Sequence, residues 1–354
     1  MRRHALQYVL IEGRPVSDSD VEIFQACGDE ILEGALWVDG RWYRIEEGIL
    51  DLLPESLAPR HTRRLFAARH NLAADDHRDS VPVTDRNKKV EQIEFFRDDS
   101  SRYDNDVSRR SFYVASDRIS FGDWVRDLTP GALVCDIGAG SGRLTLPLAE
   151  RGFHVASTDI SPDMLRIGRQ RAVTAGVDAL ATFVLADGER LPFRSDIFDA
   201  ATCYGVLHHV PNPAFVVSEA ARLLRSGGRW LSYDPHRSKV RLLFDWAMRV
   251  RPLYQELANG NPLICRDDVD RWCRDAGIAS DVALHFFVPP HLLAPLSPDA
   301  AERCLRVTDR FFNLLGLGAF GGVIVVSGTK QTAAAAARPP VAEPREPGAE
   351  VRAS

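Results

Sequence analysis

The chain has 354 residues, of which 45% are hydrophobic and 26% charged, and its formal net charge at pH 7 is −5. This composition is typical of a soluble globular protein with one large and one small domain, and a net negative charge disfavours nucleic acid as a partner. No apolar run is long enough to span a membrane, and the N-terminus lacks the apolar core of an export signal. The six cysteines form no Cys-x-x-Cys pair, so we expect free thiols and a cytoplasmic location.

Residues 1–57 are expected to form a small β-rich N-terminal domain. Short strands flank Val38-Asp39-Gly40-Arg41, a pattern typical of a hairpin turn. The end of the segment, Ile45 to Pro54, is similar to the close of small Trm112-like zinc-ribbon domains. Such ribbons hold zinc with two cysteine pairs, and this segment contains only Cys27, so we predict a ribbon-like fold without metal. Packing, partner contact and substrate capping all remain open as its role.

Residues 58–90 are polar and weakly patterned, which predicts a linker that is partly helical at 63–69. The pattern tightens from residue 91, where Phe95 and Phe96 precede Tyr103-Asp104 and a helical apolar spacing runs from 112 to 128. Two interpretations stay open for this stretch. Phe95-Phe96-Arg97 with Tyr103-Asp104 resembles a segment of small-molecule methyltransferases that lies over the cofactor, which implies the same role here. The alternative is an amphipathic helix packed on the edge of the sheet.

From residue 132 the chain alternates strands and helices, which predicts a doubly wound, mostly parallel sheet. Ser161 followed by Pro162 predicts a capped helix start, and Gly176 predicts its end. The predicted strands are 132–136, 153–158, 181–186, 199–204, 229–233, 282–288 and 321–330; the predicted helices are 141–151, 162–175, 213–224 and 267–277.

Three further segments complete the chain. Two apolar insertions, 236–262 and 289–318, are expected to roof a hydrophobic substrate chamber. Residues 331–354 are rich in alanine and proline, which predicts a disordered tail.

A glycine-rich turn follows the first strand of this sheet. The buried run Leu133-Val134-Cys135 ends at Asp136, and the turn has the spacing Gly138-x-Gly140-x-Gly142. Glycines let a backbone approach a ligand closely, but a carboxylate beside the turn disfavours a pyrophosphate and suits a ligand with a cationic end. The stretch resembles motif I of the class I S-adenosylmethionine (SAM) methyltransferases, whose cofactor carries a sulfonium and an ammonium group.

The resemblance covers 91–330 and implies a seven-stranded Rossmann-like fold with SAM as cofactor. Asp136, Asp159 and Asp187 end the first three strands, where ligands bind in open α/β sheets. By resemblance, Asp159 accepts from the ribose hydroxyls, Asp187 accepts from the adenine amino group, and Asp136 faces the amino-acid end of SAM. The alternative is that these carboxylates cap the following helices. The implied cofactor-binding set is Asp136, Gly138, Ala139, Gly140, Gly142, Asp159, Ile160, Met164, Asp187, Gly188 and Tyr204.

The stretch from Phe198 to Pro211 is similar to motif IV of the Methyltransf_11 group, whose residues reach the methyl group and the acceptor. Tyr204, His208 and His209 are therefore the candidate catalytic residues. A histidine with a near-neutral pKa is suited to take a proton from a hydroxyl or amine nucleophile. The alternative is that the two histidines only brace the loop. Alignment of the reactants alone supplies roughly 7–11 kcal/mol of a displacement barrier, so activity does not require a base.

The resemblance implies a SAM-dependent methyltransferase that acts on a small or lipid-like organic acceptor, such as a quinone or a polyketide. One alternative is an rRNA or tRNA base methyltransferase that binds RNA through the N-terminal ribbon. Another is a non-catalytic SAM-binding regulator. We expect a small-molecule partner, no metal and no nucleic acid, and the sequence leaves the acceptor and the oligomeric state open.

Overall fold

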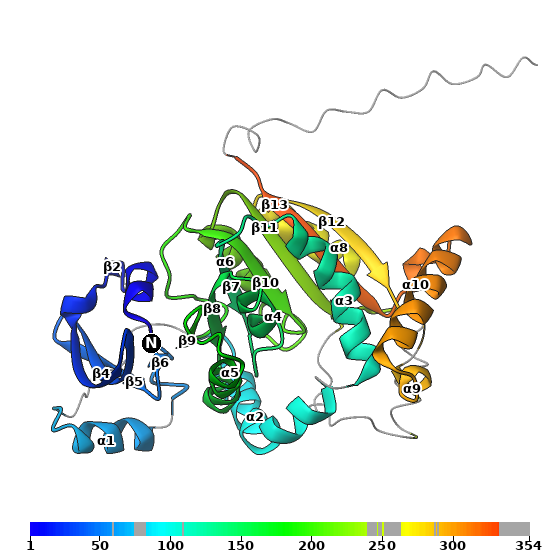
Figure 1. The fold of residues 1–354 in the computed structure, drawn as a ribbon. Coiled ribbons are helices and arrows are strands. Elements are labelled where there is room, and N and C mark those ends of the chain that lie inside the picture. The colour runs from blue at the N-terminus through cyan, green and yellow to red at the C-terminus, as the bar shows by residue number, and fades with distance from the viewer. Residues whose placement is uncertain are drawn as a thin grey trace, which may run out of the picture.

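The computed structural model describes residues 1–58, 60–73, 83–107, 110–238, 246, 250, 263–286, 288 and 290–332. Most of the predicted insertion at 236–262 and the predicted tail beyond 332 lie outside these residues. The side chains of 98–107 also lie outside the description, so the expectation for Tyr103-Asp104 is not addressed. The described residues build one long sheet with helices on both faces (Figure 1).

Seven neighbouring strands of this sheet form the predicted Rossmann-like unit. β7, β8, β9, β10 and β11 run parallel, and β13 is antiparallel to both β11 and β12. This arrangement confirms the predicted fold class. In spatial order the strands are β12 (Ile278–His285), β13 (Val323–Lys330), β11 (Leu224–Pro235), β10 (Phe198–Tyr204), β7 (Leu133–Ile137), β8 (His154–Asp159) and β9 (Ala181–Leu185).

The N-terminal strands continue the same sheet beyond β9, which the sequence did not predict. The short strand β6 pairs in parallel with β9, and Leu50 opposite Val184 is 0% exposed. The edge of β9 is thereby covered, which removes a row of unpaired backbone groups. The predicted hairpin is present, with positive φ at Asp39 and Gly40 between β4 and β5. The strands are β3 (Val21–Cys27), β4 (Glu30–Val38), β5 (Arg41–Glu46) and β6 (Ile49–Asp51), blue in Figure 1.

Two short segments precede these strands. The 3-10 helix Arg3–Tyr8 packs its apolar residues into the core beside β8 and β9. The strands β1 (Leu10–Ile11) and β2 (Arg14–Pro15) form a separate hairpin, and a second 3-10 turn covers Asp18–Asp20.

Helices cover the two faces of the sheet unequally. α3, α4, α5 and α10 contribute apolar residues to the cores on one face, whereas α6 and α8 cover the other. The insertion at 289–318 is helical, and its longer helix α10 packs on α3 (Figure 1). The helices are α1 (Arg60–Arg69), α2 (Arg86–Val107), α3 (Ser111–Arg126), α4 (Thr145–Ala149), α5 (Pro162–Ala175), α6 (Pro213–Leu223), α8 (Arg266–Asp275), α9 (Pro290–Leu293) and α10 (Pro298–Leu314), with a 3-10 turn at Gly318–Phe320. Within the described parts of the chain, no helix combines the length and apolar character needed to cross a membrane.

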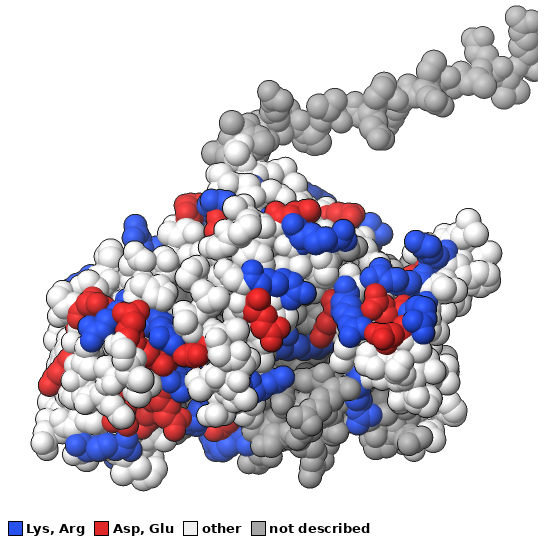
Figure 2. Space-filling model, in the orientation of Figure 1, with Lys and Arg blue, Asp and Glu red and all other residues white. Residues whose placement is uncertain are grey.

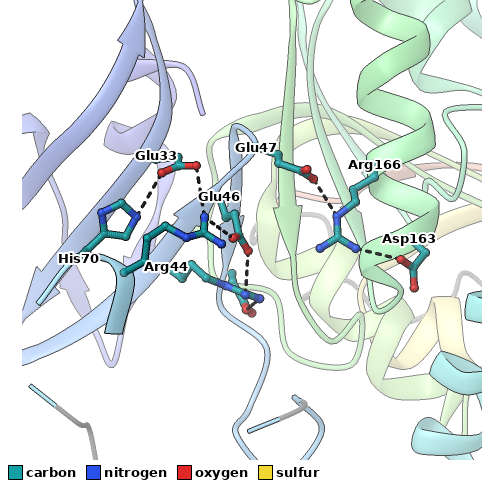
Figure 3. Close-up of polar contacts among 9 residues, drawn as sticks. Glu33, Arg44, Glu46, Glu47, His70, Asp163 and Arg166 are labelled. Atoms are coloured by element: carbon teal, nitrogen blue, oxygen red, sulfur yellow. Dashed lines mark hydrogen bonds and ion pairs between the residues drawn. The ribbon is translucent and has the colours of Figure 1, made fainter. Parts of the chain in front are cut away.

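Ion pairs connect the N-terminal strands with α5. Arg166 Nε donates to Glu47 Oε2 at 2.8 Å, and its Nη1 donates to Asp163 at 2.9 Å (Figure 3). Arg169 donates to Glu30 at 2.9 Å on the same side. The Arg166–Glu47 pair is exposed and contributes little, whereas Arg169 and Glu30 are partly buried. The apolar burial along β6 and β9 is the larger contribution at this junction.

We expect Leu50→Ala to lower the free energy of unfolding by about 2–5 kcal/mol, because it removes a fully buried side chain at this junction. Urea unfolding followed by circular dichroism measures the change. Leu65→Ala is the control, since Leu65 is 53% exposed, and it should change the stability by less than about 0.5 kcal/mol. Equal, small effects of both substitutions would contradict a junction built on β6.

Candidate functional site

The candidate site lies at the carboxyl ends of the five parallel strands. The chain passes from β7 to β8 and β9 and then returns to the other side of β7 with β10. Ligands of open α/β sheets bind in the crevice at such a switch point. The loops that follow β7, β8, β9, β10 and β11 therefore surround the site.

The glycine turn after β7 packs directly against the loop after β10. Gly138 has a φ of +68°, and a Cβ atom at this position would lie 2.3 Å from Val206 Cγ2. Gly140 and Gly142 also have positive φ, at +55° and +88°. Met164 is buried with its methyl group against the turn, where a Cβ at Gly140 would lie 3.2 Å from it. The turn thus has a close-packed shape that only glycine permits.

Asp159 is held beside this turn by main-chain amides. Its Oδ2 accepts from Gly140 N at 2.8 Å, and its Oδ1 accepts from Ser161 N at 2.8 Å. Burial raises the pKa of the carboxyl to about 6, and the two amides oppose the rise. Each carboxylate oxygen has a second lone pair, so Asp159 has acceptor capacity for two hydroxyl groups. Ile160, the next residue, is half-buried.

Asp136 lies beneath the turn instead of on its open side. The residue is 1% exposed, and its carboxylate accepts from Thr145 Oγ1 at 2.7 Å and from Thr202 Oγ1 at 2.9 Å. Burial raises the pKa of this carboxyl, and the two hydroxyl donors partly offset the rise. Asp136 therefore connects α4 and β10 to β7. Its contact with the amino-acid end of the cofactor stays a prediction.

Asp187, in the loop after β9, has a buried cationic partner. Its Oδ2 accepts from Lys89 Nζ at 2.5 Å, and its Oδ1 accepts from Glu189 N at 3.0 Å. Gly188 lies between the two acidic residues, where a Cβ would meet Ile137 Cγ2 at 3.3 Å. Asp187 keeps the predicted place at the carboxyl end of the sheet, and Lys89 enters the site from α2.

His208 forms a buried pair with Asp234. The ring nitrogen Nδ1 lies 2.7 Å from Asp234 Oδ1, which also accepts from the main-chain N of His208 at 3.2 Å. Asp234 is 1% exposed at the end of β11, and burial raises the pKa of its carboxyl well above the ordinary value. This geometry assigns the Nδ1–H tautomer to neutral His208, with Nε2 as the acceptor nitrogen.

His209 lies against His208 but has a different environment. The two ring centroids are 3.9 Å apart, and Phe96 from α2 contacts the His209 ring edge-on at 6.0 Å. Burial, followed by the neighbouring His208 and Lys88, lowers the pKa of His209 well below its ordinary value. His209 is therefore neutral at physiological pH.

Tyr204 contacts α3 through its hydroxyl group. Its hydroxyl donates to Asp117 Oδ1 at 2.9 Å, and its ring stacks on Tyr233 with centroids 4.2 Å apart. The Arg143 guanidinium lies 4.8 Å from the Tyr204 ring and also donates to Asp117. Burial, with the Asp117 charge next, raises the pKa of Tyr204 well above its ordinary value, so the hydroxyl stays protonated. The structure brings Tyr204 into this packed cluster.

Sequence reasoning missed Asp234, Lys89 and Glu189. Asp234 ends a parallel strand in the same way as Asp136 and Asp159, so the same pattern applied to the fifth strand would have found it. Lys89 carried no comparable signal, because its role depends on how α2 packs against loops about a hundred residues away. In the described part of the chain, no three His, Cys, Asp or Glu side chains are grouped as metal ligands.

Comparison with known proteins identifies the family. The family model described as "Methyltransferase domain" (Methyltransf_11) matches residues 135–232. A demethylmenaquinone methyltransferase of Clavibacter sepedonicus is 32% identical over 234 residues, which cover 58% of this chain and 94% of that protein. The chain belongs to the class I SAM-dependent methyltransferases, and SAM is its cofactor.

Other relatives match shorter stretches. A ubiquinone biosynthesis O-methyltransferase of Xylella fastidiosa is 35% identical over 30% of this chain and 44% of that protein. A ubiquinone/menaquinone biosynthesis C-methyltransferase of Brucella canis is 32% identical over 37% of this chain and 52% of that protein, so the chain spans about half the length of these two. A solved complex of the Haloferax volcanii Trm112 methyltransferase activator and a putative methyltransferase aligns with a TM-score of 0.49 at 19% identity, over 68% of this chain and 97% of that chain.

We expect Gly138→Ala to destabilise the protein more than Gly131→Ala. Both glycines have positive φ, which costs an alanine about 1–2 kcal/mol, but a Cβ at Gly131 meets nothing within 4 Å. At Gly138 the contact with Val206 should add about 1–3 kcal/mol. Urea unfolding measures the loss of unfolding free energy in the two variants. Equal losses would show that Val206 can move away from the new Cβ atom at little cost.

Proposed function

We propose that this chain transfers the methyl group of SAM to a small aromatic acceptor that carries a phenolic hydroxyl, such as a hydroquinone. The observation that carries the proposal is the His208–Asp234 pair at the carboxyl edge of the sheet. Val206 connects the loop of His208 to the glycine turn, so the candidate base and the candidate cofactor loop are direct neighbours.

The proposed cofactor-binding groups are the glycine turn, Asp159 and Asp187. The glycine turn carries no side chains at Gly138, Gly140 and Gly142, so its backbone can approach a ligand, and Asp159 has the acceptor capacity for a ribose diol. Asp187 supplies acceptors for the adenine amino group. When bound, SAM supplies an electrophilic methyl group on a sulfonium centre.

The proposed base is His208. A phenol ionises near pH 10, as the tyrosine side chain does, so at neutral pH it needs a proton acceptor to become a good nucleophile. Nε2 of His208 takes the phenolic proton, and Asp234 holds the ring orientation and stabilises the imidazolium through Nδ1. At oxygen, the phenolate forms the O–CH3 bond as the S–CH3 bond breaks, and the phenolic proton leaves to solvent through His208. At a ring carbon, the same displacement gives a dienone, which loses the C–H proton of that carbon and regains a proton on oxygen, so that one proton is again released in total.

The choice of acceptor is supported by the relatives and by the surface. The curated relatives named above are methyltransferases of ubiquinone and menaquinone biosynthesis. On the face shown in Figure 2, basic and acidic side chains are interspersed. Arginines such as Arg41 and Arg118 form ion pairs with Glu12 and Asp299. Such a surface suits a small uncharged acceptor better than a polyanion.

Methyl transfer to a panel of hydroquinones, catechols, amines and RNA, with SAM labelled in the methyl group, tests the proposal. We expect the labelled methyl group to appear in the phenolic compounds only. Asp159→Ala should abolish this transfer, because it removes the proposed hydrogen-bond acceptor for the ribose. Binding of S-adenosylhomocysteine without transfer to any acceptor would favour a regulatory binder. Absence of binding would contradict the cofactor site itself.

Cofactor affinity should depend on pH through Asp159. Its raised pKa of about 6 means that the carboxylate becomes protonated, and a poorer acceptor, as the pH falls below 6. Calorimetric titration with S-adenosylhomocysteine should give a Kd about tenfold higher at pH 5 than at pH 7.5. Asp159→Asn should bind weakly with little pH dependence. A pH-independent affinity of the unaltered protein would contradict this role of Asp159.

The role of His208 is tested by His208→Asn, because an asparagine amide can still donate to Asp234 but cannot take a proton. We expect kcat to fall about 10²–10⁴-fold while the affinity for S-adenosylhomocysteine changes little. The fall in kcat should be smaller for a more acidic phenol, because such a phenol ionises without a base. A uniform deficit across phenols of different acidity would indicate that His208 only braces its loop.

A further inference from the structure

Lys89 has an unusual position for a lysine. It lies in the first turn of α2 and is 2% exposed. Its ammonium group donates to Asp187 Oδ2 at 2.5 Å, to Glu189 Oε2 at 2.9 Å and to Thr84 Oγ1 at 3.0 Å. These three contacts use all three donors of the ammonium group.

Charge explains why the cation is retained there. Asp187 and Glu189 are both buried and lie two residues apart. Two buried carboxylates repel each other, and a buried ammonium between them compensates one of the two charges. Without Lys89 the two buried carboxylates of the loop after β9 would lose their shared cationic partner, which favours a rearranged loop.

Asp187 still has acceptor capacity toward a ligand. Of about four lone-pair sites on its carboxylate, Lys89 uses one and the main-chain N of Glu189 uses another. An ionised carboxylate only accepts hydrogen bonds. It can therefore accept a hydrogen bond from the amino group of adenine, and it repels the carbonyl oxygen that hypoxanthine has at the same position.

The surrounding contacts hold Lys89 in place. Glu189 Oε1 accepts from Asn212 N at 2.8 Å, which ties the loop after β9 to the start of α6. The Gln92 side-chain amide, one turn along α2, donates to the main-chain oxygen of His209. α2 therefore contacts both the loop after β9 and the loop after β10, which fixes the position of Lys89 relative to Asp187.

We propose that Lys89 is a positioning residue that keeps Asp187 as an acceptor and thereby makes the cofactor site select adenine over hypoxanthine. Lys89 acts through Asp187 and is not placed in contact with the reacting atoms. The inference rests on the proposed role of Asp187 and adds the residue that enforces base selectivity.

Calorimetric titration of S-adenosylhomocysteine and S-inosylhomocysteine into the full chain tests this inference. We expect the unaltered protein to prefer the adenine ligand by about tenfold or more, the effect of one hydrogen bond to a charged group. In Lys89→Met and in Lys89→Gln, which keeps a donor without the charge, this preference should fall below about threefold, mainly through weaker binding of the adenine ligand. Lys88→Met, from the same turn of α2, is the matched control and should keep the preference.

The ratio of the two affinities separates the outcomes. If both Lys89 variants lose the same affinity for the two ligands and still prefer the adenine ligand, Lys89 has only a structural role, and the inference is overturned. Tighter binding of S-adenosylhomocysteine after Lys89→Met would show that Lys89 competes with adenine, which also overturns it. If the unaltered protein binds neither ligand, the proposed function fails instead.

Discussion

The close contact between Gly138 and Val206 is the constraint on which the candidate site depends. A side chain at position 138 would occupy the space of Val206, so the glycine allows the loop after β10 to lie on the turn after β7. Methyl transfer in line requires the donor carbon and the nucleophile to be aligned within a fraction of an ångström. Direct packing of one loop on the other achieves this without a flexible connection, and it places His208, two residues beyond Val206, at the same edge of the sheet.

The residues around each carboxylate at the end of a parallel strand give that carboxylate its own properties. Burial raises the pKa of Asp136, Asp159 and Asp234 alike. Two threonine hydroxyls surround Asp136, main-chain amides hold Asp159, and the His208 ring faces Asp234. Position along a strand therefore predicts where a carboxylate lies, whereas its hydrogen-bond donors decide whether it supports the sheet, accepts from a ligand or orients a base.

Local features of the fold could be predicted from the sequence because they depend on neighbouring residues. The Ser161 cap, the end of α5 at Gly176 and the turn at Asp39-Gly40 are present where the sequence predicts them. The pairing of β6 with β9 and the burial of Lys89 depend on segments more than ninety residues apart, so no local pattern indicates them. The apolar insertion expected at 289–318 contains the helices α9 and α10, but the pattern of apolar residues does not indicate which acceptor they would contact.

The two histidines show how packing divides roles between adjacent residues. Their rings are 3.9 Å apart, so two positive charges there would repel strongly. Burial keeps His209 neutral, and its main-chain oxygen accepts from α2. His208 has a carboxylate beside it, Asp234, which can stabilise a positive charge on the ring. In the proposed mechanism, Asp234 stabilises the proton that His208 takes from the acceptor, and the neutral ring of His209 packs against the imidazolium.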